Sequence, residues 1–420
     1  MSFDLNNIEQ NPKLGFYKVN GRTFYSKPEA YMYATEINEP AVWHFNTSVY
    51  AKLDWTVEPE LDIRELYRLR AVQLREKYDY IRVEASGGGD STTAIFAFLL
   101  NGIHLDEVVF RYPKQGEKGV SADPFTTKAD NTLSEWHYAA KPLLDWISVN
   151  HPTVKITVHD YSENMLAEEK TRDESWVFTT RDWFQPGHGN KHTHFGTNEH
   201  KDLAESGKSI CVLYGVDKPK ITIVDDGWYG YFIDLYANHA NPVNDGYTNI
   251  TSELFYWSPD LPEISIKQAH MIRRWFDMPQ NHHLRHLVNE QDPNRRTAYE
   301  FIAKSIIYPD YDLQTWQTSK PTNSFYNEMD HWFYTNFKDT NLYAAWEKGL
   351  QFLIDKIDPK YFYYQLGKPV GLGMQRSSLY YIGPAAIINT SPSFPNRAVA
   401  TTKNLGVSIV KDKRIIRTTI

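Results

Sequence analysis

The chain lacks the marks of secreted and membrane proteins. It has a single cysteine in 420 residues, Cys211, which excludes an intrachain disulfide and favours a reducing compartment. No apolar run approaches the roughly 20 residues that span a bilayer. The first residues, Met-Ser-Phe-Asp-Leu-Asn-Asn, have neither the basic nor the apolar region of a signal peptide. We therefore expect a cytoplasmic protein that is not embedded in a membrane.

The chain also has fewer basic residues than acidic ones. Lysine and arginine number 45 against 52 aspartates and glutamates, a formal net charge of −7. This balance disfavours broad, sequence-independent binding of nucleic acid, although it leaves room for a local basic surface. Aromatic residues, in contrast, make up 15% of the chain, which indicates pockets or interfaces as well as hydrophobic cores.

A glycine-rich run carries the strongest signal in the sequence. Residues 80–85 alternate as a short buried strand does, and residues 94–100 form an apolar segment typical of a packed helix. Between them lies Ser-Gly-Gly-Gly-Asp-Ser, residues 86–91. A glycine turn at a helix N-terminus presents backbone N–H groups and a favourable dipole to an anion. The alternative is a ligand-free turn, but the pattern favours a phosphate site.

The form of this loop separates it from the common nucleotide motifs. It has no lysine where a Walker A loop needs one, and its glycines do not have the Gly-x-Gly-x-x-Gly spacing of a dinucleotide fingerprint. Over about a dozen residues it resembles the Ser-Gly-Gly-x-Asp-Ser loop of the PP-loop ATP pyrophosphatases, the adenine nucleotide alpha-hydrolase superfamily. The resemblance is plausible over roughly 80–235. It implies a doubly wound parallel sheet that cleaves ATP to AMP and pyrophosphate.

The resemblance also implies roles for individual residues. Asp90 would hold Mg²⁺ against the phosphates of ATP, as a single carboxylate commonly does. The end of the next strand, 106–112, would meet the adenine; the alternative for Arg111 is an ordinary strand-end charge. The expected nucleotide-binding residues are Ser86, Gly87, Gly88, Gly89, Ser91, Thr92, Arg111, Tyr112 and Lys220.

A second informative run, Gly-Val-Asp-Lys-Pro-Lys, follows the apolar strand at 209–215. Strand ends of this kind are where ligands bind in doubly wound sheets. PP-loop enzymes commonly place a basic residue after a later strand, and Lys218 and Lys220 resemble it. We expect Lys218 to act with Asp90 in catalysis, against the alternative of a solvated turn lysine. Asp225 and Asp226 read either as further metal ligands or, more simply, as a turn.

The histidines between 188 and 200 raise a metal alternative. His188, His192, His194 and His200 lie with Glu199 in one loop, but their spacing matches no tight ligand set and no cysteine assists them. A loop near the substrate is the preferred interpretation.

Three stretches of the chain are expected. Residues 1–60 contain a hairpin around Asn20-Gly21 and a helix at 27–36 with Pro28 in its first turn. Residues 61–235 form the nucleotide-binding α/β domain, with strands at 80–85, 106–112, 154–158 and 209–215 and with Pro142 marking a kink or late helix start. Residues 236–420 form a mainly helical substrate or interaction region. The predicted fold class is α/β, a doubly wound parallel sheet with an N-terminal β-hairpin.

In the C-terminal stretch, Ser265 and Gln268 are spaced as a capping box that begins a helix. Four basic residues of that helix read as a solvated face or a substrate-binding face: Lys267, His270, Arg273 and Arg274. Further helices are expected at 296–306 and 340–357, and short strands in 376–420.

Several chemistries remain for such a site. Sulfur-transferring members rely on cysteines, and Cys211 lies in a buried strand; residues 212–420 contain no cysteine for a phosphosulfate-reductase-like reaction. Members that split glutamine begin with a cysteine after the initiator methionine, whereas this chain begins Met1-Ser2. We therefore expect an ATP- and magnesium-dependent ligase that adenylates a carbonyl or carboxyl for attack by a nitrogen nucleophile. The alternatives are a phosphoadenosine-phosphosulfate-reductase-like or nucleotide-sensing protein with little turnover, and modification of a nucleic-acid base. The acceptor and the oligomeric state are left open.

Overall fold

The computed structural model describes residues 5–112, 136–160, 170–178, 201–234, 244, 246–288, 293–311, 328–365, 367–385, 407–409 and 415–418. The predicted histidine loop at 188–200 lies outside these residues.

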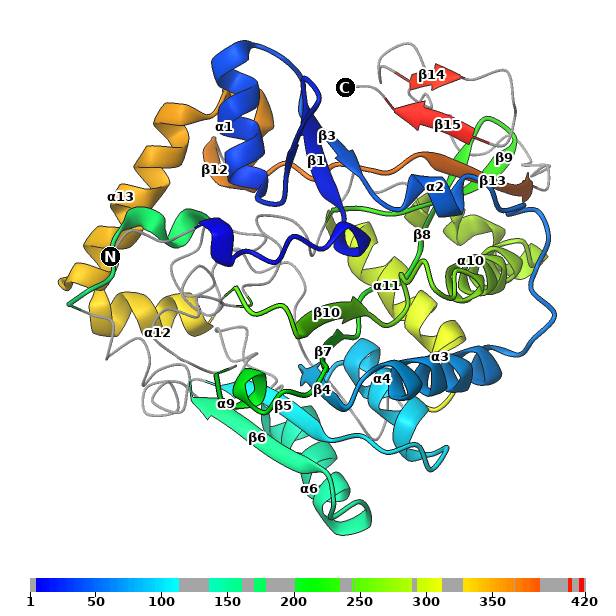
Figure 1. Cartoon of the computed structure of the whole chain (residues 1–420). Coiled ribbons are helices and arrows are strands. Elements are labelled where there is room, and N and C mark those ends of the chain that lie inside the picture. The colour runs from blue at the N-terminus through cyan, green and yellow to red at the C-terminus, as the bar shows by residue number, and fades with distance from the viewer. Residues whose placement is uncertain are drawn as a thin grey trace.

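A five-stranded parallel sheet forms the centre of the fold, as the sequence predicts (Figure 1). Its order is β10-β7-β4-β5-β6, so β4, which delivers the glycine loop, is the middle strand. The order is compatible with a Rossmann-like fold of the kind that the resemblance implies. The strands are β4 (Tyr80–Ala85), β5 (Glu107–Tyr112), β6 (Lys155–Asp160), β7 (Ile210–Tyr214) and β10 (Ile250–Leu254).

Helices cover both faces of this sheet. On one face the alternate residues Ile81, Val83, Cys211 and Leu213 share a hydrophobic core with α3 (Ile63–Lys77), α4 (Gly89–Leu99) and α6 (Lys141–Asn150). On the other face, a small cluster joins Ile210, Val212 and Ile250 to Ala204 of α9 (Lys201–Glu205). The arrangement follows from the two-residue period of strands, which sends successive side chains to opposite faces. A π-helical turn, Trp136–Ala140, precedes α6, and Pro142 lies in the first turn of α6, so the predicted late helix start is confirmed.

The N-terminal segment forms a small antiparallel sheet in the order β2-β1-β3. Asn20 and Gly21 connect β1 and β2 with positive φ values of 45° and 79°, as a tight hairpin requires. The predicted hairpin and the following helix with its early proline are confirmed. The elements are η1 (Leu5–Asn7), η2 (Pro12–Leu14), β1 (Phe16–Val19), β2 (Arg22–Phe24), α1 (Lys27–Ile37), β3 (Val42–His44) and α2 (Thr47–Tyr50).

A second five-stranded sheet, which the sequence did not predict, combines distant parts of the chain. Strands β8 (Lys220–Val224) and β9 (Gly227–Tyr231) form a hairpin directly after the Lys218 run, and β9 pairs with β13 (Leu379–Pro384). Strands β15 (Ile415–Thr418) and β14 (Val407–Ile409) extend the sheet in the order β14-β15-β13-β9-β8. The short strands expected in 376–420 are therefore present.

Helices and one further hairpin complete the C-terminal stretch. In Figure 1, α10 and α11 lie at the right of the molecule and α12 and α13 at the left, where α13 packs against α1. The predicted helices at 296–306 and 340–357 correspond to α11 and α13. The elements are η5 (Glu174–Phe178), α10 (Glu263–Phe276), η6 (Pro279–Val288), α11 (Pro293–Ile307), α12 (Glu328–Phe337), α13 (Asn341–Lys356), η7 (Pro359–Tyr361), β11 (Phe362–Gln365) and β12 (Lys368–Leu372).

One hydrophobic core includes residues from all three predicted stretches, from Leu14 to Ile382. Strand β10 lies beyond the expected boundary at 235, yet it pairs along its length with β7. The N-terminal, central and C-terminal stretches therefore pack together around the central sheet. The domain boundaries themselves stay a prediction.

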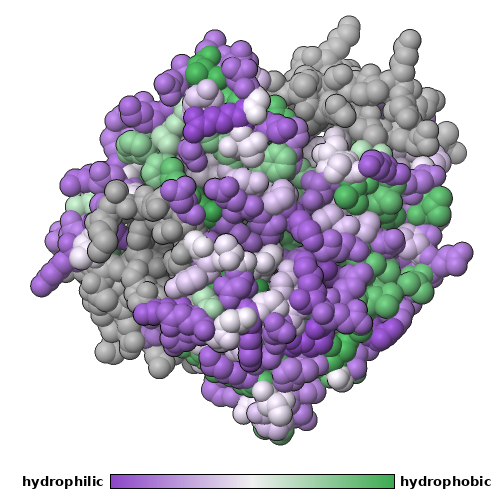
Figure 2. Space-filling model, in the orientation of Figure 1, coloured by the Kyte–Doolittle hydropathy of each residue, from purple (hydrophilic) through white to green (hydrophobic). Residues whose placement is uncertain are grey.

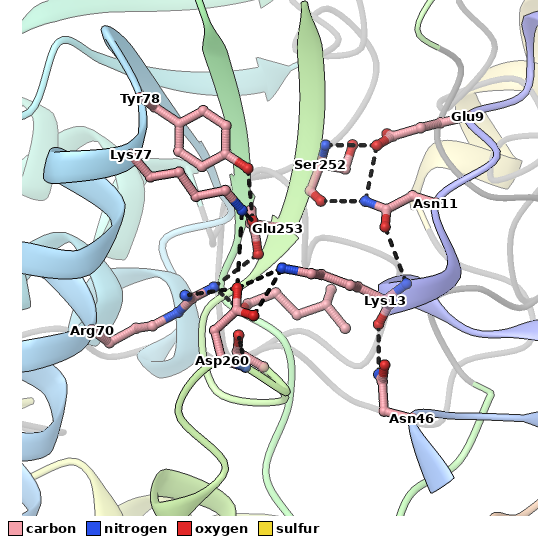
Figure 3. Close-up of polar contacts among 12 residues, drawn as sticks. Glu9, Asn11, Lys13, Asn46, Arg70, Lys77, Tyr78, Ser252, Glu253 and Asp260 are labelled. Carbon is pink, nitrogen blue, oxygen red and sulfur yellow. Dashed lines mark hydrogen bonds and ion pairs between the residues drawn. The ribbon is translucent and has the colours of Figure 1, made fainter. Parts of the chain in front are cut away.

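The N-terminal segment also covers the outer edge of β10 (Figure 3). Glu9 Oε1 accepts a bond from the Ser252 backbone N at 2.9 Å, and Asn11 Nδ2 donates to the Ser252 carbonyl at 2.8 Å. These side chains supply the donor and the acceptor that a neighbouring strand would supply. Beside them, Glu253 accepts bonds from Arg70, Lys77 and Tyr78. An uncovered edge strand invites pairing with another chain, so this polar cluster protects the sheet.

The molecular face in Figure 2 is mostly hydrophilic, with hydrophobic residues in separate small groups. Among the helices that the structure describes, none has both the length and the apolar character to cross a bilayer.

Candidate functional site

The glycine loop connects the middle strand of the sheet to the N-terminus of α4. Gly87 has a φ of +75°, a conformation that glycine adopts without strain, and Gly88 is the residue that precedes the helix. No side chain caps this helix end. The first N–H groups of a helix have no partners within it, so those of Gly89, Asp90 and Ser91 point out of the helix end. The loop has the form of an anion site.

Hydroxyl groups hold the loop in this shape. Ser91 Oγ accepts a bond from the Ser86 backbone N at 3.1 Å, and Ser86 Oγ accepts one from the Gly88 N at 3.3 Å. The two serine hydroxyls are 3.4 Å apart. The hydroxyl of Thr92, one position further, is buried and has no hydrogen-bond partner among the residues that the structure describes. The two serines therefore act on the loop itself in this state.

Asp90 is the partly exposed carboxylate of the loop. It lies in the first turn of α4, with its side chain 22% exposed. Its Oδ1 atom is 2.8 Å from Lys218 Nζ and accepts a bond of 2.5 Å from the Tyr308 hydroxyl. The structure thus brings together the two residues, Asp90 and Lys218, that the sequence predicts as a catalytic pair from separate strands.

Lys218 is a buried cation held by two carboxylates. Its side chain is 3% exposed, and its Nζ atom is 2.8 Å from both Asp90 Oδ1 and Asp217 Oδ1. Burial lowers the pKa of Lys218, but the charges of Asp217 and Asp90 outweigh it and hold this pKa well above its usual value. Burial likewise raises the pKa of Asp217, and Lys218 and Lys220 more than reverse that effect. Both groups are therefore charged at neutral pH.

Lys220 extends the same chain of charges. It is the first residue of β8 and is 1% exposed. Its Nζ atom lies 3.5 Å from Asp217 Oδ2 and 3.4 Å from Glu300 Oε1. The alternative of a solvated turn lysine at Lys218 is therefore wrong, because this side chain and that of Lys220 are buried among carboxylates. Contact of either lysine with a nucleotide stays a prediction.

Helix α11 and Tyr308, the residue that follows it, supply site residues that sequence reasoning missed. Tyr308 donates to Asp90, Lys304 Nζ lies 3.6 Å from Asp90 Oδ2, and Glu300 contacts Lys220. These three residues are spaced by four, so they lie on one face of the helix. That spacing was the available signal, but it indicates a shared face without indicating what the face contacts.

Buried tyrosines form the floor under Asp90. Tyr256 donates to the Asp90 carbonyl at 2.7 Å, and its ring lies 5.4 Å from that of Tyr308. Burial, together with the nearby charge of Asp90, raises the pKa of Tyr308 well above its usual value. The pKa of Tyr256 is raised by burial first. Both hydroxyls therefore remain protonated donors at neutral pH, which fixes the position of the loop.

The residues present fit a magnesium–nucleotide complex by their chemistry. The uncapped helix end provides N–H donors, the orphaned Thr92 hydroxyl lies in its first turn, and Asp90 is a partly exposed carboxylate. Within the described ranges, no group of three or more His, Cys, Asp or Glu residues could hold a metal ion by itself. A metal at Asp90 would consequently need oxygen ligands from phosphates, which is how Mg²⁺ is commonly held.

Arg111 and Tyr112, which are expected near the adenine, are the last two residues of β5, and β5 pairs with β6. Arg111 Nε is 3.2 Å from Glu84 Oε2, and Arg82 also contacts Glu84. Tyr112 pairs with Asp160 in the sheet, and its side chain lies outside the described part. Arg111 is thus a paired charge between neighbouring strands in this state. Its contact with adenine stays a prediction.

The capping box predicted at Ser265 and Gln268 is wrong. Helix α10 begins at Glu263, with Pro262 as its N-cap, three residues before the predicted N-cap. Ser265 is therefore inside the helix, and both Ser265 and Gln268 are fully buried. Ser265 Oγ donates to the Tyr256 carbonyl, and Gln268 Nε2 donates to the Tyr67 hydroxyl. The two residues are three positions apart because they lie on the same buried face of α10, where they contact Tyr256 and Tyr67.

The basic residues of α10 join distant segments. His270 is buried with its Nε2 atom 2.9 Å from the Trp55 carbonyl, and burial lowers its pKa. Lys267 and Arg274 both contact Glu58, and Arg273 donates to carbonyls of β13. The basic residues of α10 therefore bind neighbouring segments of the chain and do not form a simple solvated face.

Asp225 and Asp226 form the turn between β8 and β9, with Asp225 at a φ of +53°. The turn interpretation is therefore confirmed. Cys211 is fully buried in β7, and burial raises its thiol pKa well above the usual value. The prediction that Cys211 lies in a buried strand is confirmed, and a buried, protonated thiol is a poor nucleophile.

Gly215 allows the Lys218 run to approach the glycine loop. A Cβ atom there would lie 2.7 Å from Ser91 Cα and 2.8 Å from the Asp90 carbonyl oxygen, both backbone atoms. Gly215→Ala is therefore expected to lower the free energy of unfolding by about 1–3 kcal/mol in urea denaturation. Gly88→Ala is the control, because a Cβ at Gly88 meets only Ser86 Oγ, at 3.3 Å. Equal stability of Gly215→Ala and wild type would contradict the close packing.

No protein-family profile matches this chain, and no curated protein matches it significantly. The interpretation of the site therefore depends on its residues and their geometry.

Proposed function

We propose that the protein is an ATP-dependent adenylating enzyme. It cleaves ATP to AMP and pyrophosphate and activates a carbonyl or carboxyl for attack by a nitrogen nucleophile. The observation that carries the proposal is the meeting of Asp90 and Lys218, 2.8 Å apart, at an uncapped glycine-rich helix end. A helix N-terminus, a carboxylate and a buried lysine are the groups that a metal-bound polyphosphate requires.

Each group has a separate task. The N–H groups of Gly89, Asp90 and Ser91 would bind phosphate oxygens, and Asp90 would hold the metal in place of its present partners. Magnesium, when bound, neutralises phosphate charge. Lys218 then stabilises the negative charge that builds on the leaving pyrophosphate, because a fixed cation acts most strongly on charge that develops in the transition state. The charges of Asp217 and Asp90 keep Lys218 protonated against the opposing effect of its burial.

A product analysis tests this proposal. The full chain is incubated with ATP, magnesium, ammonia and a panel of carboxylic acids, and the products are separated. Release of pyrophosphate with AMP, dependent on one of the acids, is the expected result. Release of orthophosphate with ADP would contradict the proposal, because it would mean cleavage of the other phosphoanhydride bond.

A further inference from the structure

The charges around Asp90 balance in the free protein. Lys218, Lys220 and Lys304 lie among three carboxylates, those of Asp90, Asp217 and Glu300. A polyphosphate that enters this site adds negative charge. When Asp90 turns to a metal ion, the cations that it now holds become available to the phosphates. The cation that is held most weakly will move most easily.

Lys304 is that cation. Its Nζ atom lies 3.6 Å from Asp90 Oδ2, beyond hydrogen-bond distance, and its side chain is 21% exposed. Lys218 and Lys220 are 3% and 1% exposed, and each contacts two carboxylates. Lys304 therefore has more freedom than its two neighbours and gives up less when it leaves Asp90.

Helix α11 holds Lys304 firmly against both halves of the site. Tyr299 donates to the Pro219 carbonyl at 2.7 Å, next to Lys218. Tyr308 donates to Asp90, and Tyr67 donates to the Ile307 carbonyl at 2.8 Å. Between these anchors, Lys304 lies one turn from each of Glu300 and Tyr308. The helix is thus fixed in place, while the side chain of this lysine is partly exposed and makes no close hydrogen bond to Asp90.

We propose that Lys304 is a phosphate-binding residue of this site and that it contacts the metal-bound phosphates released as pyrophosphate. The inference rests on the proposed function and adds a residue from the C-terminal stretch to it. Since Lys304 flanks Asp90, it lies next to whatever phosphates Asp90 holds through a metal. It is expected to contribute to binding of pyrophosphate and ATP, and to contribute little to binding of AMP, which lacks those phosphates.

Calorimetric titration of the full chain tests the inference. The ligands are inorganic pyrophosphate and ATP, each with magnesium, and AMP. Lys304→Ala is expected to weaken pyrophosphate and ATP binding about 10- to 100-fold, the range for one hydrogen bond to a charged group. AMP binding should change less than about threefold. Lys304→Arg should recover much of the loss, and Lys348→Ala, at an exposed position on α13, should bind as wild type does.

The outcomes separate the inference from the proposed function. If wild type binds the ligands and Lys304→Ala binds pyrophosphate equally well, the inference is wrong and the function stands. If AMP binding falls as much as pyrophosphate binding, the inference is also wrong. If wild type binds none of the ligands, both fail. If Lys304 only neutralised Asp90, Lys304→Ala would bind magnesium-pyrophosphate more tightly than wild type, because the carboxylate would be free for the metal. That result would also contradict the inference.

Discussion

Replacing Lys218 with methionine is expected to reduce kcat/KM for pyrophosphate release at least about 100-fold. The substitution keeps most of the side-chain volume and removes the charge that faces Asp90 Oδ1 at 2.8 Å. Loss of a single preorganised group that stabilises transition-state charge typically costs 100- to 1,000-fold in kcat. The measurement is steady-state pyrophosphate release with the acid identified in the product analysis. Lys348→Met, at an exposed site on α13, is the control.

The same substitution also removes a partner of buried Asp217, so folding must be measured separately. Asp217 is 5% exposed and would retain the bond from the backbone N of residue 218 and the longer contact with Lys220 at 3.5 Å, but it would lose its nearest cation. Removal of one partner from a buried pair costs about 3–5 kcal/mol. If Lys218→Met does not fold, the double variant Asp217→Asn, Lys218→Met removes both charges and should be the more stable. Turnover close to wild type in a folded variant would contradict the role of Lys218.

Breaking the buried ion pair between Lys27 and Asp234 is expected to have the largest effect on stability. Lys27 Nζ lies 2.7 Å from Asp234 Oδ2, and the two side chains are 1% and 0% exposed. Tyr17 and the Gln375 backbone also donate to this carboxylate. The pair joins α1 to the end of the β8–β9 hairpin. Lys27→Met should lower the free energy of unfolding by about 3–5 kcal/mol at pH 8, because it leaves a buried carboxylate without its cation.

The loss should be smaller in mild acid. Burial raises the pKa of Asp234, and Lys27 opposes that rise, so the pKa rises further when Lys27 is removed. A carboxyl with a raised pKa in the folded state favours folding at low pH, and this contribution is lost as the pH rises through the folded-state pKa. Urea unfolding at pH 5 and pH 8 measures the difference.

Lys141→Met provides the matched control for this pair. Lys141 and Asp145 form an ion pair whose side chains are 52% and 64% exposed. Exposed pairs contribute about 0–1 kcal/mol, so this variant should unfold almost as wild type does. An equal loss in both variants, or a loss at Lys27 that does not depend on pH, would contradict the account of the buried pair.

The parallel sheet and the glycine loop could be predicted because their signals are local. Residues 80–99 carry a strand pattern, a glycine turn and an apolar helix within 20 positions, and the hairpin at Asn20-Gly21 is equally local. The sequence also indicated that Lys218 follows a buried strand, and strand ends of a parallel sheet meet at one edge. For that reason the approach of Lys218 to Asp90 could be expected.

The contribution of α11 could not be predicted in the same way. Glu300, Lys304 and Tyr308 reach Asp90 and Lys220 from more than 70 positions further along the chain, through packing that no periodicity encodes. The pairing of β9 with β13 is similarly remote in sequence. The error at Ser265 and Gln268 has the same origin, because a capping-box spacing and two buried helical positions look alike until the helix start is known.

Calorimetric titration of the full chain with ATP, with and without magnesium, tests the central claim most directly, because it needs no acceptor. Wild type should bind one equivalent of magnesium-ATP with a Kd between about 1 μM and 1 mM, the usual range for an enzyme and its substrate. Asp90→Asn should weaken that binding at least about tenfold, and without magnesium it should bind ATP no worse than wild type, because a carboxylate that repels phosphate is gone. Absence of binding to wild type, or equal affinity of both proteins for magnesium-ATP, would contradict the assignment of this loop as an ATP site.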